Sequence, residues 1–121
     1  MNESNDEVLK IELAKAVSGL LYSSESDYPF EIIENVLPQQ LLNAKEIEAD
    51  HFFKNLTTEE DWFGKEEKAK AAQYTALYNL LKENLSELKV YKTGETDIEI
   101  YILGKSKSGT FMGLKTRSVE T

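Results

Sequence analysis

The chain contains no cysteine and only one histidine among its 121 residues. Without cysteine, disulfides and thiolate zinc sites are excluded, and a reducing compartment such as the cytoplasm is the expected location. The single histidine, His51, leaves no Cys/His pair and no Ser/His arrangement with a spare base. No apolar run approaches the roughly 20 residues of a bilayer-spanning helix. The acidic opening segment MNESNDEVLK does not have the pattern of a secretory signal.

Basic residues are also few: fourteen stand against twenty-two acidic ones, and the net charge is −8. A field of this sign repels nucleic acid and anionic membranes and steers a protein toward basic surfaces. Direct nucleic-acid and membrane partners are therefore not expected, although solubility alone also accounts for the charge. The length suits a single domain over residues 1–121, since no repeat, low-complexity tract or linker divides it.

Two long stretches have the periodicity of helices that pack one face on a core. The first covers residues 6–19, and the second runs from about residue 64 to 86. Pro38 predicts the start of a short third helix, because proline fits the first helical turn. The segment DHFFKNL (50–56) is ambiguous, and a half-turn that buries its two phenylalanines is one interpretation. The apolar stripe of the longest helix consists of Tyr74, Leu77, Tyr78, Leu81 and Leu85.

Alternating polar and apolar residues predict strands, most clearly in the last third of the chain. The segments 87–94, 97–105 and 110–120 alternate in this way, and residues 30–36 and 45–49 suit shorter strands. The GKSKSG connection suits a hairpin loop. Helices first and in the middle, with antiparallel strands last, predict an α+β domain whose helices pack on a mixed or antiparallel sheet.

The segment LLYSSESDYPFE (20–31) places Glu25 and Asp27 among three serines. Serines beside acids bond neighbouring backbone amides, so a simple polar turn is one interpretation. The spacing is not that of a D-x-D-x-D-G calcium loop, and a self-contained metal site is not expected. An exposed carboxylate here is instead able to donate an oxygen to a metal ion held by another protein. Magnesium suits that role because its open positions usually hold water or phosphate.

Two other segments contain candidate contact residues. In TTEEDWFG (57–64), a threonine followed three residues later by an acid resembles a capping box, and Asp61 favours a helix N-terminus. Trp62 fits either the core or an exposed binding surface, where tryptophan is enriched. The chain ends in GLKTRSVET, which alternates to the last residue and predicts that a structured element holds the carboxylate of Thr121, although most termini fray.

Together, GLLYSSESDYPFE, FFKNLTTEEDWFGKEE and the segment from ENLSELKV to GLKTRSVET resemble the nuclease A inhibitor-like family. This resemblance implies a three-layer α/β/α sandwich with a mainly antiparallel sheet. It also implies that Glu25, in the S-E-S-D loop, reaches the catalytic magnesium ion of a sugar-non-specific nuclease. Asp61 and Trp62 match a pair that grips the enzyme, and Thr121 matches a C-terminal threonine that contributes at the active site. Loop support is expected from Ser24, Ser26 and Asp27.

The predicted function is one-to-one inhibition of a magnesium-dependent, sugar-non-specific DNA/RNA endonuclease. The chain itself is expected to be monomeric, to lack enzymatic activity, and to need no cofactor or metal of its own. Glu25 would replace a scissile phosphate oxygen, while the net charge of −8 would imitate the polyanion. Two alternatives stay open: a non-inhibitory acidic interaction module with the same fold and another partner, and a carboxylate-based hydrolase.

Overall fold

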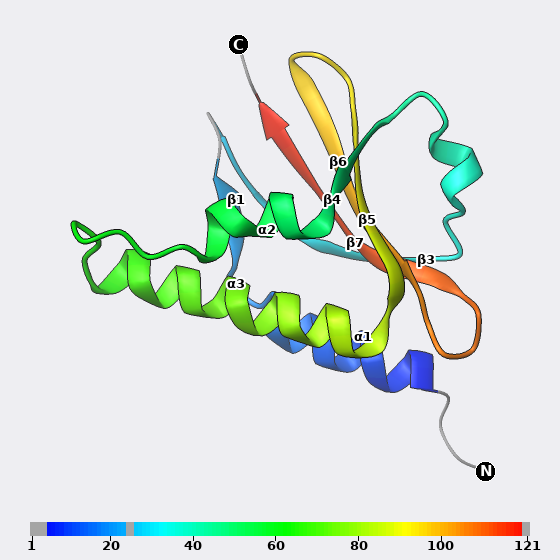
Figure 1. The fold of residues 1–121 in the computed structure, drawn as a ribbon, viewed down its shortest axis with the longest axis horizontal. Helices are drawn as coiled ribbons and strands as arrows, with labels where there is room; N and C mark the ends of the chain where they lie inside the picture. Colours follow the sequence, from blue (N-terminus) through cyan, green and yellow to red (C-terminus); the bar gives the residue numbers. More distant parts are fainter. Residues whose placement is uncertain (1–4, 24–25, 120–121) are drawn as a thin grey trace.

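A computed structural model describes residues 5–23 and 26–119. It contains α-helices, one 3₁₀ helix (η1) and β-strands, which follow one another along the chain (Figure 1). In chain order they are α1 (Asn5–Ala16), β1 (Leu21–Ser23), β2 (Asp27–Pro29), β3 (Glu31–Glu34), η1 (Pro38–Leu41), β4 (Lys45–Glu48), α2 (Ala49–Thr57), α3 (Lys65–Asn84), β5 (Ser86–Thr93), β6 (Asp97–Lys105) and β7 (Phe111–Val119).

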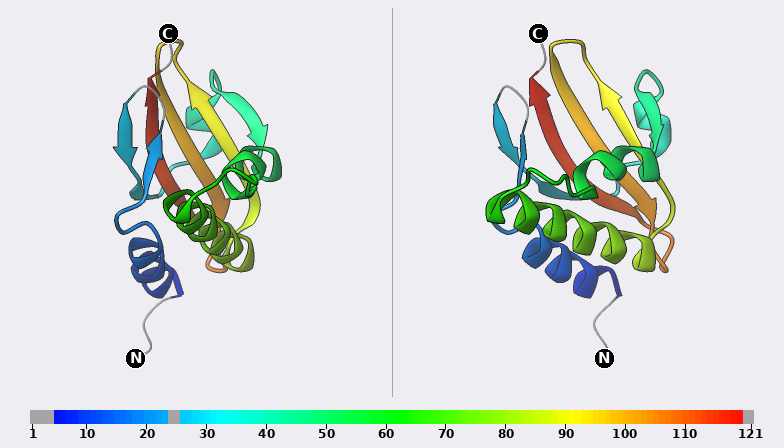
Figure 2. Two further views of the ribbon diagram at one scale, coloured as in Figure 1. Left: turned by 90° about the vertical axis from the view of Figure 1, so that its left-hand side faces the viewer. Right: turned by 60° about the vertical axis from the view of Figure 1, so that its left-hand side comes forward.

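The main sheet has five strands in the order β3-β7-β6-β5-β4, and all neighbours are antiparallel. β1 and β2 form a separate antiparallel hairpin that lies beside β7. The three α-helices lie on one face of the sheet, with α3 running alongside α1 (Figure 2). The α+β class and the antiparallel sheet that the sequence predicts are therefore confirmed.

The core lies between the helices and the inner face of the sheet. Ile98, Ile100 and Ile102 alternate along β6 with outward-facing residues, and Ile102 is paired with Leu114 on β7 and Val90 on β5. Ile100, Ile102, Val90 and Leu114 have no measurable exposure. Burying each such side chain contributes roughly 1.5–3 kcal/mol. The alternation of apolar and polar side chains along β5, β6 and β7 therefore determines which face of the sheet packs against the helices.

The opposite face of the sheet is polar, and Glu99, Tyr101 and Lys115 point from it. The connection from β3 to β4 contains η1 and lies next to Glu46 and Tyr91, which point to this outer side. Among the described residues, the α-helices thus lie on one face of the sheet, and only the short η1 lies on the other face.

The sequence placed most elements correctly. The helix predicted over about 64–86 is α3, and the three predicted C-terminal strands are β5, β6 and β7. The ambiguous segment 50–56 lies within α2, a helix of nine residues and not a half-turn, and its two phenylalanines are buried as expected. Alternate apolar side chains make a long strand visible in sequence, whereas a short helix with two adjacent phenylalanines has no clear period.

The first turn of α1 is bonded to the loop between β6 and β7. Ser108 Oγ donates to Asp6 Oδ2 at 2.6 Å, and Ser106 and Thr110 lie in the same cluster of hydroxyls. The hydrogen bond from Ser108 lowers the pKa of Asp6 below its ordinary value of 3.8, although partial burial opposes this. The ionised carboxylate therefore stabilises the folded state above pH 3.8, and this contribution is lost as the pH falls through the lowered pKa.

Ser108→Ala is expected to make the free energy of unfolding less sensitive to acid. The wild type should lose more stability than the variant between about pH 6 and pH 3, because the variant lacks the largest of the hydrogen bonds that lower the pKa of Asp6. Urea unfolding at the two pH values measures this difference. Ser86→Ala is the matched control, since the Ser86 hydroxyl donates to the Lys105 backbone carbonyl, a group that does not titrate. Equal acid sensitivity of Ser108→Ala and the wild type would contradict the prediction.

Candidate functional site

The S-E-S-D loop is the turn of the β1–β2 hairpin. Ser23 is paired with Asp27, and Ser24 and Glu25 between them lie outside the described residues. Ser26 and Asp27, which follow these two residues in the chain, are exposed. Among the described residues, no hydrogen bond or ion pair of the Asp27 carboxylate is found, and its predicted support of the loop stays a prediction.

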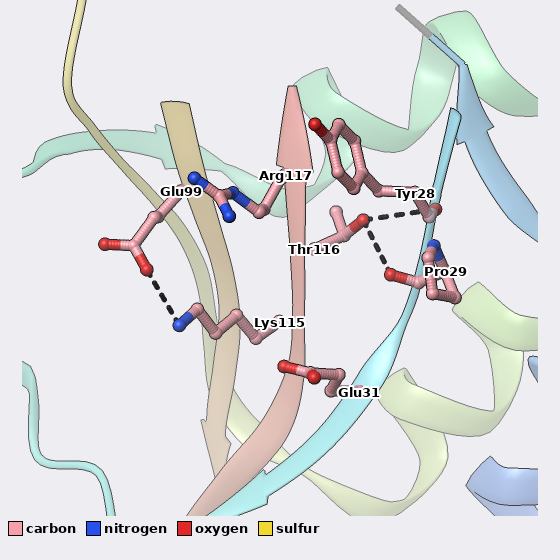
Figure 3. A pocket seen from close by; sticks show the side chains of 7 residues that line it. All are labelled: Tyr28, Pro29, Glu31, Glu99, Lys115, Thr116 and Arg117. Atoms are coloured by element: carbon pink, nitrogen blue, oxygen red, sulfur yellow. Dashed lines mark hydrogen bonds and ion pairs between the residues drawn. The ribbon is translucent and has the colours of Figure 1, made fainter. Parts of the chain in front are cut away.

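Both strands of the hairpin accept hydrogen bonds from side chains of other elements. The Tyr74 hydroxyl, on α3, donates to the Leu21 carbonyl of β1 at 3.0 Å. On the other side, Thr116 Oγ1 of β7 donates to the Pro29 carbonyl of β2 at 3.0 Å. Figure 3 shows the Thr116 hydroxyl directed at the backbone of the neighbouring strand. The hairpin is thus fastened between α3 and β7.

Trp62 lies in the loop between α2 and α3, and 73% of its side chain is exposed. Its ring packs edge-to-face on Phe63, with the centroids 4.7 Å apart. Asp61 is exposed beside it. A tryptophan of this exposure contributes little to the core, so the core interpretation does not fit its position, and a role of Trp62 in binding stays a prediction.

The capping-box interpretation of TTEEDWFG is wrong. Thr57 ends α2, and its hydroxyl donates back to the Phe53 carbonyl, while the Thr58 hydroxyl donates to the Lys54 carbonyl. These threonines therefore satisfy carbonyls at the end of α2. α3 begins at Lys65 after Gly64, which has no side chain to cap it. Asp61 and Trp62 therefore lie in the loop between the two helices and belong to neither helix.

The hairpin and the tryptophan loop meet on the first half of α3. One hollow is lined by Leu21 and Asp27 from the hairpin together with Lys70 on α3. A second hollow is lined by Trp62 and Phe63, and Lys70 lines it as well. The structure therefore brings two of the predicted site segments to one end of the molecule, on either side of a shared α3 residue.

The last described strand, β7, lies beside the hairpin. Thr121 lies outside the described residues, but β7 can be followed to Val119. Arg117 on β7 lies over the Tyr28 ring of the hairpin, 5.7 Å from its centroid. The described part of β7 ends at the side of the molecule where β1 ends and β2 begins (Figures 1 and 2). The strand leading to Thr121 thus runs beside the strand that follows the S-E-S-D turn.

The basic residues of β7 are neutralised by acidic partners on β6. Lys115 forms an ion pair with Glu99 at 2.7 Å, and Arg117 pairs with Asp97 (Figure 3 shows the Lys115 pair). These hydrogen bonds raise the pKa of Lys115 and of Arg117, so both side chains stay charged and engaged. Each of these two cations of β7 is therefore matched by one acidic side chain of β6.

Residues 5–23 and 26–119 contain no group of three histidine, aspartate or glutamate side chains that could hold a metal ion. His51 is exposed on α2. In the part of the chain that the structure describes, no helix is both long and apolar enough to cross a membrane.

Comparison with known proteins assigns the family. The family described as nuclease A inhibitor-like protein matches residues 7–121. The chain belongs to the nuclease A inhibitor-like family. A search of curated proteins found no match. Membership confirms the resemblance inferred from the three motifs, and it identifies the functional class as inhibitor-like, with a nuclease as the general kind of partner.

Sequence reasoning did not select Tyr74 or Thr116 as part of the site. Tyr74 was expected only in the apolar stripe of α3, which it does occupy with 1% exposure. Thr116 is buried on β7 and was one residue of an alternating strand. Pro29 was the available signal, because a strand residue without an N–H leaves a neighbouring carbonyl in need of another donor.

Proposed function

We propose that this member of the nuclease A inhibitor-like family inhibits a magnesium-dependent, sugar-non-specific endonuclease in a one-to-one complex. Glu25 is directed at the catalytic metal ion, while Asp61, Trp62 and the C-terminal Thr121 contact the enzyme around it. The observation that carries this proposal is the convergence of the hairpin and the tryptophan loop on α3, in a chain that matches the family over residues 7–121. The free inhibitor is monomeric and cytoplasmic.

The inhibitor acts by occupying the place of the substrate. A carboxylate oxygen of Glu25 replaces a phosphate oxygen as metal ligand, and it offers no phosphodiester bond to cleave. The net charge of −8 attracts the basic cleft of a nuclease and mainly raises the association rate. Trp62 loses its water shell in the complex and mainly slows dissociation. The hairpin turn and the tryptophan loop therefore make binding specific, and the charge of the whole surface makes association fast.

Glu25→Ala is expected to weaken inhibition at least about tenfold, which corresponds to roughly 1.4 kcal/mol. DNA cleavage by a magnesium-dependent, non-specific nuclease is titrated with the wild type and with the variant. Glu83→Ala is the control, because it removes an equal charge from an exposed position at the opposite end of α3 and should inhibit like the wild type. Stoichiometric inhibition by the wild type with loss only in Glu25→Ala supports the proposal. Equal weakening in both variants would favour the acidic interaction module.

A further inference from the structure

The β1–β2 hairpin is too small to hold its own position. Each strand has three residues, and the hairpin is separate from the five-stranded sheet. Isolated two-stranded hairpins are at best marginally stable in water. Something outside the hairpin must therefore fix the direction in which its turn points.

Tyr74 supplies one anchor. Leu21 is paired with Pro29, which has no N–H to donate across the hairpin, and the Leu21 carbonyl instead accepts from the Tyr74 hydroxyl at 3.0 Å. The Tyr74 side chain is only 1% exposed, and its ring meets Phe30 edge-to-face at 6.1 Å between centroids. Burial raises the pKa of Tyr74, so the hydroxyl keeps the proton that it donates.

Thr116 supplies the second anchor, from the opposite side. Its side chain is 2% exposed, and its hydroxyl donates to the Pro29 carbonyl at 3.0 Å. β2 and β7 belong to different sheets, so this side-chain hydrogen bond joins them in place of a ladder of backbone hydrogen bonds. Nearby, Gln73 Nε2 donates to the Ala16 and Ser18 carbonyls at 2.8 and 3.2 Å, which fastens the chain just before β1 to α3.

We propose that Tyr74 and Thr116 are positioning residues that hold the β1–β2 hairpin in one orientation and so present its turn to the nuclease. The inference rests on the proposed function. A hairpin whose strands are already held in place loses less conformational entropy when it binds, and its affinity is higher for that reason. The two hydroxyls donate to opposite strands of the hairpin, and neither takes part in the chemistry at the metal.

Tyr74→Phe is expected to weaken inhibition about fivefold to tenfold, since it removes one buried hydrogen bond and little volume. Tyr78→Phe is the matched control. It removes the same atom one turn further along α3, where the hydroxyl donates to the Asp50 carboxylate and not to the hairpin. A purely structural role predicts that neither variant changes the inhibition constant of the folded protein. Thr116→Val should weaken inhibition by a similar factor to Tyr74→Phe.

A double-mutant cycle and hydrogen exchange complete the test. In a Glu25→Ala background the effect of Tyr74→Phe should disappear, because no metal ligand is left to position. Amides of residues 21–28 should exchange faster in Tyr74→Phe than in Tyr78→Phe. Wild-type inhibition that is unchanged in Tyr74→Phe, with unchanged hairpin exchange, would overturn the inference. Failure of the wild type to inhibit would overturn the proposed function, and hairpin exchange would still decide whether the Tyr74 hydroxyl holds β1.

Discussion

Trp62→Ala is expected to weaken nuclease inhibition at least about thirtyfold, or roughly 2 kcal/mol, and to change the free energy of unfolding by less than about 0.5 kcal/mol. The indole is 73% exposed, so the folded protein alone loses little when it is removed. In the complex, the ring is withdrawn from water against the enzyme, and truncation costs that burial. Inhibition titrations and urea unfolding of the same preparation measure the two quantities.

Leu42→Ala is the matched control for this prediction. Leu42 is 82% exposed and follows η1, on the face of the sheet opposite the α-helices. Its removal deletes a comparably exposed apolar side chain, and inhibition should remain within about twofold of the wild type. Normal inhibition by Trp62→Ala would place the indole outside the interface. A large loss of stability in Trp62→Ala would show instead that its edge-to-face contact with Phe63 supports the fold.

Local periodicity accounts for the parts of the fold that the sequence predicts well. α3 has twenty residues, and β5 to β7 have eight or nine each, so a repeating apolar pattern has room to appear. The pattern also states which side is buried, as the isoleucines of β6 show. Strand order in the sheet is different, because it depends on contacts between distant segments that no local pattern encodes.

The β1–β2 hairpin could not be predicted in this way. Three residues per strand are too few for a period, and Pro29 within β2 argues against a strand at all. The capping-box interpretation of the threonines after Phe53 was wrong for a related reason. A threonine hydroxyl can accept from amides at a helix start or donate to carbonyls at a helix end, and here Thr57 and Thr58 do the latter.

The candidate site likewise contains residues that motifs in the sequence indicate and features that only tertiary packing reveals. Glu25 and Thr121 were inferred from motifs, and both lie outside the described residues, so their roles stay predictions. Trp62 and Asp27 were also inferred from motifs, but their common place beside α3 comes from tertiary packing. Tyr74 belongs to neither group, because a tyrosine in an apolar stripe looks like ordinary core until its hydroxyl is seen to bond the hairpin.

Phe53→Ala is expected to lower the free energy of unfolding by about 3–5 kcal/mol, the largest stability effect among these predictions. The Phe53 side chain has no measurable exposure, and its ring stacks on Tyr78 at 4.5 Å between centroids. It also meets Phe52 edge-to-face at 5.2 Å. Because α2 contacts α3 through this cluster, truncation leaves a cavity where the two helices join. Urea unfolding monitored by circular dichroism measures the loss.

His51→Ala is the control, since His51 is an exposed neighbour on the same helix and its loss should cost less than about 0.5 kcal/mol. Phe53→Leu should fall between the two, because it refills part of the cavity. Similar stabilities of Phe53→Ala and the wild type would mean that α2 is not held through this ring. The functional consequence follows from connectivity, because α2 and α3 flank the loop that carries Trp62. The cavity left by Phe53→Ala should therefore weaken inhibition even under conditions where the variant remains folded, whereas Tyr78→Phe removes only an exposed hydroxyl from this junction and keeps the stacked ring.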